Sequence, residues 1–209
     1  MRIIFQNDFF VAVEKEAGWL TTPARFGEKD SRPVLGLELQ KQIGHQIFPV
    51  HRLDFEVSGL VLFALDAKAH SEANTLFEKS QVQKTYEALT ENNNPSTPNL
   101  NETFEWKSRI LRGKKRAYES PHGKPSLTWA RYLGKLGENL RWELKPVTGR
   151  SHQLRFDLAR HGYPICGDAL YGAQAVIEGK IELRSISLEF KDSNFCQRWK
   201  IPAILSLAT

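Results

Sequence analysis

Short apolar runs separated by polar breaks dominate the hydrophobic pattern of this sequence, which is typical of β-strands joined by turns. The apolar stretches at 3–5 and 9–13 flank Asn7-Asp8, and this predicts a β-hairpin. The continuous run GLVLFAL at 59–65 is expected of a buried strand. We predict further strands at 47–50, 85–90, 128–133, 140–144 and 181–190.

Helical periodicity is confined to three isolated segments, which are 34–43, 67–79 and 151–161. Gly44 follows the first segment and is expected to end that helix. We expect Ser151 to be the N-cap of the third helix and Gly162 to be its C′ residue. Because strands dominate and the helices occur singly, the sequence predicts a mixed α+β sheet protein.

One segment, ENNNPSTPNLN at 91–101, carries five Asn and two Pro and is the most loop-like part of the chain. It is either a hinge or the base of a projecting arm. The length of 209 residues is typical of one domain. We therefore predict a single domain over 1–209, with a loop-rich basic insertion at about 91–127.

Composition places the chain among ordinary folded proteins, with 41% hydrophobic and 25% charged residues. Polar residues interrupt the apolar stretches at the N-terminus, so no signal peptide is expected, and no run is long enough for a membrane span. Two cysteines, Cys166 and Cys196, do not make a secreted disulfide framework. We expect a cytoplasmic monomer without membrane contact.

The net charge of +5 is concentrated in one segment. Between Lys107 and Lys124 there are seven Lys or Arg residues and one acid, which leaves the rest of the chain at −1. Trp106, Tyr118 and Trp129 lie in or beside this segment, and basic groups mixed with aromatic rings suit phosphate contact and base stacking. A solvated loop whose aromatic residues pack inward is the alternative, and the residues alone do not decide.

A polar hexapeptide at 51–56 lies between two apolar runs that should both be core strands. Its charges cannot enter the core, so we expect them at the rim of the sheet, where rigid strands can present them to a ligand. Asp54 is therefore a candidate active-site carboxylate. Two structural alternatives stay open, namely an ion pair between Arg52 and Asp54, and an Asp54 that caps a turn.

A second polar segment begins at the turn Thr148-Gly149 and runs into the predicted third helix. Arg150 would then lie at a helix N-terminus, which favours anions. His152 and Arg155 are three residues apart and are expected to share a polar helix face, although a solvated face would look the same. The buried face is marked by Leu154 and Leu158.

Downstream, Gly167-Asp168 and Tyr171-Gly172 predict a tight loop in which Asp168 has a structural role. The six histidines show no pair at a metal-ligand spacing, so we expect no metal. A Gly-rich phosphate loop and a dinucleotide fingerprint are also absent from the sequence, so no cofactor is expected.

Four ordered motifs together resemble the RluA family of RNA pseudouridine synthases. HRLDFEVSGLVLFA at 51–64 resembles the family's HRLDxxTSGLLLLA, and KTY at 84–86 is similar to its KxY. The other two are TGRSHQLR at 148–155, similar to TGRxHQ[IL]R, and HGYPICGDALYG at 161–172, similar to GHPIxGDxxYG. GKPSLTWARYL, from Gly123, also resembles the segment before the last motif block. The likeness is to short members that lack an S4-type RNA-binding domain, so recognition would rest on the core.

The sequence departs from the family pattern at several positions. Val57 replaces the usual Thr, Glu16 replaces the Pro of KPxG, and Asp157 stands where a His is frequent. The sequence LRS at 183–185 replaces a frequent LHA. No residue with a chemical role is lost, so these departures bear on the substrate more than on the activity.

The resemblance implies a fold, a reaction and a set of site residues. The fold would be α+β, with a mixed, largely antiparallel central sheet and flanking helices. Asp54 would be the catalytic nucleophile, Tyr86 would stack on the target uracil, and Arg155 would pair with Asp54 and hold it charged and aimed. Further substrate-binding residues would be His51, Arg52, Lys84, Arg150 and His152.

The implied reaction breaks the N1–C1′ bond of a uridine and rejoins the base through C5, without a cofactor. The expected substrate is a stem-loop in rRNA or tRNA, because folded RNA is read through loops and shape. Two alternatives from other classes are a non-catalytic RNA-binding protein on the same fold, and a glycoside hydrolase with two carboxylates such as Asp54 and Asp168.

Overall fold

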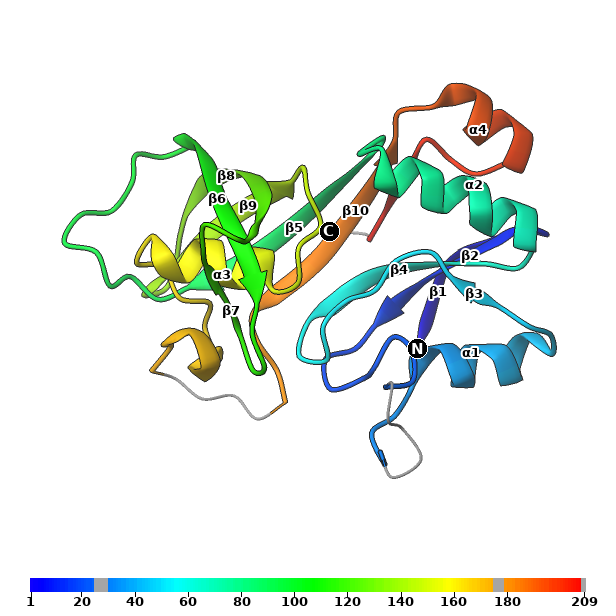
Figure 1. Cartoon of the computed structure of the whole chain (residues 1–209), viewed down its shortest axis with the longest axis horizontal. Helices are drawn as coiled ribbons and strands as arrows, with labels where there is room; N and C mark the ends of the chain where they lie inside the picture. The colour runs from blue at the N-terminus through cyan, green and yellow to red at the C-terminus, as the bar shows by residue number, and fades with distance from the viewer. Residues whose placement is uncertain (25–29, 175–178, 208–209) are drawn as a thin grey trace. The chain divides into compact units, whose positions relative to one another are not determined.

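The computed structural model describes residues 1–24, 30–174 and 179–207 and forms two compact units. Unit 1 consists of the described parts of 1–83 and 185–209, and unit 2 consists of those of 84–184 (Figure 1). No helix among the described residues is long and apolar enough to cross a membrane. Each unit contributes strands to a mostly antiparallel sheet, and four α-helices accompany the strands in the described parts of the chain.

Unit 1 is built on strands in the order β1 (Arg2–Gln6), β2 (Phe10–Lys15), β4 (Ser58–Ala64) and β10 (Leu183–Phe190), the last from residue 185 onward. The short strand β3 (Phe48–Pro49) pairs with β4, and β11 (Ile204–Ser206) pairs with β10. The predicted hairpin is confirmed, because β1 and β2 are antiparallel neighbours. The Asn7 side chain shapes its turn by accepting hydrogen bonds from the backbone N–H groups of Phe9 and Phe10.

Helices cover both faces of the unit 1 sheet. Helices α2 (Ala67–Glu78) and α4 (Ser193–Trp199) pack on the face that carries Leu60 and Leu62, and together they form the hydrophobic core. Helix α1 (Leu35–Ile43) lies on the opposite face (Figure 1), where a Cβ atom at Gly36 would be 3.4 Å from the ring of Phe63. The expected end of α1 at Gly44 is confirmed, since Gly44 has a φ of 83°.

Glycine is required at the start of β4. Gly59 has a φ of 114°, and a Cβ atom there would overlap the backbone of Ser185 on β10. The close approach of these two strands therefore depends on the absence of a side chain. Gly59 lies three residues after the polar hexapeptide 51–56, so this close approach fixes the strand into which that hexapeptide leads.

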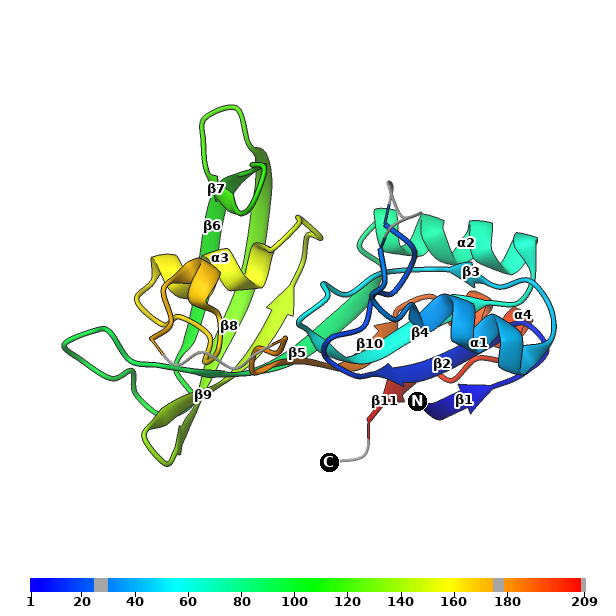
Figure 2. The ribbon, with the colours of Figure 1, turned by 90° about the horizontal axis from the view of Figure 1, so that it is seen from below.

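Unit 2 contains a fully antiparallel set of strands that extends beyond helix α3 (Gln153–Arg160), as Figure 2 shows. Their order is β5 (Val82–Thr90, from residue 84 in this unit), β9 (Asn139–Pro146), β8 (Lys124–Leu136), β6 (Thr103–Arg112) and β7 (Ala117–Glu119).

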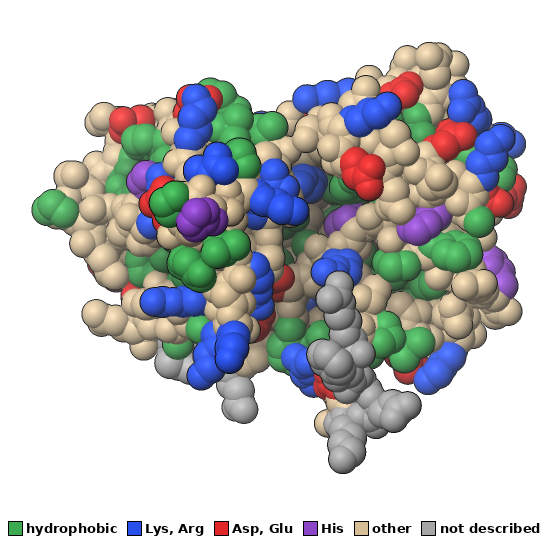
Figure 3. All heavy atoms as spheres, in the orientation of Figure 1, with side chains coloured by type: hydrophobic (Ala, Val, Ile, Leu, Met, Phe, Trp, Pro, Cys, Tyr) green, Lys and Arg blue, Asp and Glu red, His purple; other side chains and the backbone are tan. Residues whose placement is uncertain are grey.

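The loop-rich character expected for 91–127 is wrong for nearly half of that segment. Strands β6 and β7 and the first residues of β8 lie within it. Along β6, Trp106 and Ile110 are buried while Glu105 and Lys107 are exposed, so the strand alternates between core and solvent. The charges are shared between exposed positions of these strands and the turn 113–116, and Lys and Arg side chains are visible over unit 2 in Figure 3.

The core of unit 2 centres on Trp142, which is fully buried on β9. Its indole N–H donates to Thr90 Oγ1 at 3.0 Å. Four other rings surround it at centroid distances between 4.8 and 6.1 Å, and these are Phe104, Trp106, Tyr132 and Tyr163. The helix α3 covers this face of the sheet and buries Leu154 and Leu158 as expected.

The predicted start of α3 is wrong by two residues. Its N-cap position is His152, in a left-handed conformation with a φ of 54°, and Ser151 lies outside the helix. The Gln153 side chain organises this turn instead, because its Oε1 accepts from Arg150 N at 3.0 Å and Thr148 Oγ1 at 2.8 Å. At the other end Gly162, with a φ of 82°, follows the C-cap as predicted.

Replacing Trp142 with Ala should reduce the free energy of unfolding by about 3–5 kcal/mol, because it leaves a cavity inside a ring of aromatic side chains. Trp129→Ala, on the solvent face of β8 where the indole is 41% exposed, should change it by no more than about 0.5 kcal/mol. Urea unfolding of both variants measures the contrast, and equal losses would disprove the assignment of the two faces.

Candidate active site

Asp54 lies in unit 1 on a turn that neighbouring backbone segments hold from both sides. On the side before Asp54, Thr21 Oγ1 donates to the Leu53 carbonyl and accepts from the Leu53 N–H, both at 3.1 Å. On the other side, Phe55 O accepts from Gly18 N at 2.9 Å. The backbone around the half-buried Asp54 is therefore fixed at the residues immediately before and after it.

Lys15 forms the second part of this arrangement. Its side chain is completely buried at the end of β2, and its ammonium group donates to three carbonyl oxygens. The acceptors are Phe55 O at 3.2 Å, Trp19 O at 2.7 Å and Glu16 O at 3.0 Å. We call Lys15, Gly18 and Thr21, with their bonds to Leu53 and Phe55, the Asp54 clamp.

Burial lowers the pKa of Lys15 from 10.5 to about 8, and the negative charges of Asp54 and Glu56 oppose that shift. Lys15 therefore places a positive charge close to the candidate carboxylate, in surroundings with little water. The sequence analysis missed both Lys15 and Thr21. A signal existed in Lys15, since a charged residue directly follows the apolar core of a buried strand.

The residues before Asp54 differ in their surroundings. His51 Nε2 accepts from Leu62 N at 3.1 Å, and its ring stacks on Phe77 with centroids 5.2 Å apart. His51 thus ties the start of the turn to β4, and its proposed contact with substrate stays a prediction. Arg52 is exposed, as a residue that meets a ligand must be.

In unit 2, Arg155 is held by Asp168 in a two-pronged ion pair. Its Nε lies 2.7 Å from Asp168 Oδ2 and its Nη2 lies 2.8 Å from Oδ1. Both side chains are almost fully buried, with 2% and 1% exposed. This geometry fixes the plane of the guanidinium group. Asp168, predicted to be a structural loop residue, is a direct partner of Arg155, and the pairing of Arg155 with Asp54 stays a prediction.

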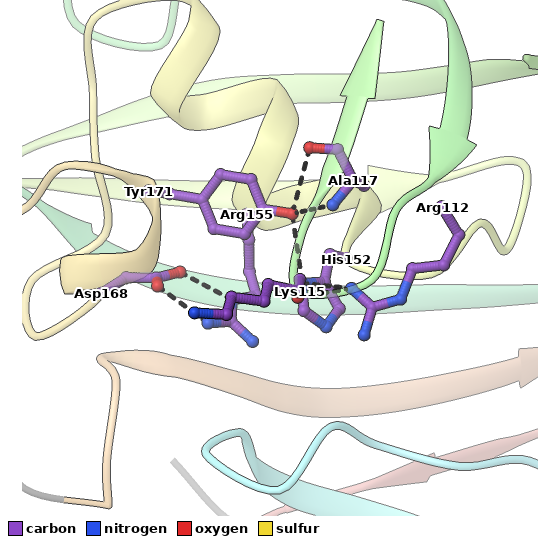
Figure 4. Close-up of polar contacts among 7 residues, drawn as sticks. All are labelled: Arg112, Lys115, Ala117, His152, Arg155, Asp168 and Tyr171. Carbon is purple, nitrogen blue, oxygen red and sulfur yellow. Dashed lines mark hydrogen bonds and ion pairs between the residues drawn. The ribbon is translucent and has the colours of Figure 1, made fainter.

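Tyr171 connects Arg155 with its surroundings (Figure 4). The Arg155 guanidinium lies over the Tyr171 ring, 5.4 Å from its centroid, while the hydroxyl lies 3.1 Å from His152 Nδ1. His152 precedes α3, so the expectation that it shares a helix face with Arg155 is wrong. The two residues are nevertheless brought together, because both contact Tyr171.

Tyr86 and Lys84 lie two residues apart on β5 and therefore point to the same face of the strand. Tyr86 is 9% exposed. Lys84 Nζ lies 3.4 Å from Thr148 O, and burial lowers its pKa. The Lys84 ammonium thus links β5 to the turn 148–150 through the Thr148 carbonyl. Arg150 lies three residues before α3, which corrects its predicted place at the helix N-terminus, and its Nε donates to Pro125 O at 2.9 Å.

Asp157, where the family pattern often has His, is a fully buried residue of α3. Its Oδ2 accepts from Thr128 Oγ1 at 2.7 Å. Burial raises the pKa of Asp157 to about 6, although the Thr128 hydrogen bond opposes the shift. This substitution is therefore part of the packing between α3 and β8. Within the described residues, no group of three or more His, Cys, Asp or Glu side chains could hold a metal ion.

The buried Lys15 predicts a specific pH dependence of stability. Its pKa is about 8 in the folded protein and about 10.4 in an unfolded chain, so between these values the folded state binds fewer protons and stability rises with pH. Between pH 7.5 and 9.5 the wild type should gain roughly 2 kcal/mol relative to Lys15→Met, which has nothing to titrate there. Urea unfolding at both pH values measures this gain, with exposed Lys79→Met as the control. A constant difference between wild type and Lys15→Met would contradict the burial of a charged Lys15.

Comparisons with known proteins agree with these features. Residues 9–160 match the family model described as RNA pseudouridylate synthase. The tRNA pseudouridine synthase C of Vibrio cholerae is 31% identical over 82% of this chain and 74% of that protein. The dual-specificity RNA pseudouridine synthase RluA of Pasteurella multocida is 34% identical over 81% of this chain and 76% of that protein.

A solved human structure, RNA Pseudouridylate Synthase Domain Containing 1, matches with a TM-score of 0.70 over 92% of this chain and 79% of that chain. At 23% identity this likeness supports the fold alone. The α+β class with a mixed, mostly antiparallel sheet is thus confirmed. The chain belongs to the RluA family of RNA pseudouridine synthases, the isomerases that convert uridine within RNA.

Proposed function

We propose that this enzyme converts specific uridines in an rRNA or tRNA stem-loop to pseudouridine, with Asp54 as the nucleophile. The Asp54 clamp is the observation that supports this assignment. A carboxylate that must meet one bond of a bound nucleotide gains from a backbone that is fixed on both sides, because small displacements at a reacting centre cost large factors in rate. The tRNA and dual-specificity names of the relatives favour a tRNA among the substrates.

Arg155 and Tyr86 have supporting roles in this proposal. Arg155 orients Asp54, and its ion pair with Asp168 restricts the guanidinium to one orientation. Tyr86 receives the uracil that has left its stack, which recovers part of the cost of unstacking. His51, Arg52, Lys84, Arg150 and His152 contact the nucleotide or its phosphates. The carbon–nitrogen bond that breaks and the carbon–carbon bond that forms involve only the substrate and these side chains.

The two units act as one catalytic domain in this proposal, since the assigned residues come from both. The enzyme works as a cytoplasmic monomer. The glycoside hydrolase alternative requires Asp168 to deliver a proton. Both Asp168 oxygens accept hydrogen bonds from Arg155, and the Asp168 side chain is only 1% exposed, so its geometry suits a structural partner of Arg155 and not a proton donor to a substrate. Asp168 is therefore a poor general acid.

RNA labelled with tritium at C5 of uridine tests the reaction, because C5 loses its hydrogen when the base is rejoined there. The wild type should release tritium from unmodified tRNA or rRNA, and Asp54→Asn should reduce the rate by at least about 10⁴-fold, the scale known for loss of a nucleophile. Asp8→Asn, which removes an exposed carboxylate from the β1–β2 turn, should keep full activity.

Two results would contradict the proposal. Release of free uracil would indicate a hydrolase. Full activity of Asp54→Asn would move the nucleophile to another residue while leaving the family assignment intact.

A further inference from the structure

The structure divides the basic segment into residues with different roles. Lys107 pairs with Glu105 at 2.6 Å, and Arg109 Nε donates to Pro121 O at 3.0 Å. Arg112 Nη1 donates to Lys115 O at 2.9 Å, which braces the turn 113–116. These three cations are therefore already used within the strands β6 to β8 and the turns that join them.

Apart from Lys124, which is exposed at the start of β8, the turn 113–116 carries the remaining positive charge of this region. The side chains of Lys114, Lys115 and Arg116 are exposed, and no ion pair with another described residue involves them. Tyr118, two residues further, is 46% exposed. We call Lys114, Lys115, Arg116 and Tyr118 the hairpin tip. Three uncompensated cations beside an exposed aromatic ring match the chemistry of a nucleic-acid backbone with an accessible base.

The hairpin is fastened to helix α3 near both ends of that helix. Near the C-terminal end, Arg160 pairs with Glu119 at 3.0 Å and donates to Lys107 O at 2.9 Å. Trp106 stacks on His161 with ring centroids 4.6 Å apart. The β6–β7 hairpin therefore does not move independently of α3.

Near the N-terminal end of α3, Tyr171 is hydrogen-bonded to the hairpin at Ala117, which lies between Arg116 and Tyr118 of the hairpin tip. The Ala117 N–H donates to the Tyr171 hydroxyl at 2.7 Å, and Ala117 is 1% exposed (Figure 4). Arg112 Nη1 also lies 3.3 Å from His152 Nδ1. Burial raises the pKa of Tyr171, so the hydroxyl keeps its proton and can donate as well as accept.

We propose that the hairpin tip is a phosphate-binding surface for the substrate RNA, and that Tyr171 couples its occupancy to the orientation of Arg155. The coupling follows from two contacts of one rigid side chain. The Tyr171 hydroxyl is bonded to the backbone next to Arg116, and the Tyr171 ring lies under the guanidinium of Arg155. RNA phosphates bound at the tip therefore contact the hairpin whose backbone holds the ring on which Arg155 rests. This inference depends on the proposed catalytic role of Arg155.

The test compares four variants. The tip variant changes Lys114, Lys115 and Arg116 to Gln, and a matched variant removes the same charge from exposed unit 1 residues, Lys68, Lys79 and Lys191. Tyr171→Phe keeps the ring and removes the hydroxyl. Arg112→Gln removes the second link to His152 and serves as an independent version of the same change if Tyr171→Phe does not fold.

Equilibrium RNA binding as a function of salt tests the surface. The slope of log Kd against log salt should fall by about two to three in the tip variant, since each lost phosphate contact contributes about 0.7–0.9. The matched unit 1 variant should keep the wild-type slope. Equal slopes in the tip variant and the wild type would overturn the surface. Because this measurement needs no turnover, it stays valid even if the tritium assay disproves the proposed function.

Single-turnover rates at saturating RNA test the coupling. Tyr171→Phe and Arg112→Gln should each lower the rate about tenfold or more, while a Tyr171 that only stabilises the fold would leave the rate of the folded enzyme unchanged. When either change is combined with the tip variant, the fold reduction in the single-turnover rate should be smaller than the product of the two separate fold reductions, because both changes interrupt the same connection. Losses that multiply would show that the tip and Arg155 act independently and would overturn the coupling.

Discussion

The Asp54 clamp is the constraint on which the account of this enzyme depends. Polar turns at the edge of a sheet are ordinarily mobile. Here the residues on either side of Asp54 are hydrogen-bonded to the segment 15–21. Lys15 carries a buried charge whose desolvation is costly, and three carbonyl acceptors and two nearby carboxylates offset that cost. The structure thus buries a charged side chain beside the carboxylate that we propose as the nucleophile.

Unit 2 shows the same principle at Arg155. The guanidinium is held by a buried two-pronged ion pair and an aromatic ring, so its position is determined by Asp168 and Tyr171. Breaking a buried ion pair by removing one partner costs more than the pair contributes to stability, because it leaves an uncompensated charge. Asp168 and Tyr171 therefore position the arginine that we propose as the partner of Asp54.

Local signals in the sequence predicted much of the fold and pointed to Asp54 as a candidate site residue. The β1–β2 hairpin and the end of α1 at Gly44 follow from turn and cap residues, and Asp54 follows from its place between two apolar runs. Strands β6 and β7 were missed because their charged solvent face hides the alternation beneath it. The Asp54 clamp could not be predicted, since Thr21 and Lys15 meet residues 32 and 40 positions away. Tyr86 and Arg155 were identified only through resemblance.

The central claim is that the Asp54 clamp, and not the carboxylate alone, sets the rate of isomerisation. Thr21→Val tests it most directly, because Val has the shape of Thr but cannot bond to either polar group of Leu53. Thr22→Val is the matched control one residue along the chain. The account predicts that Thr21→Val lowers the single-turnover rate of pseudouridine formation by about 10- to 100-fold with little change in RNA affinity, while Thr22→Val keeps the wild-type rate. A folded Thr21→Val enzyme with the wild-type rate would contradict it.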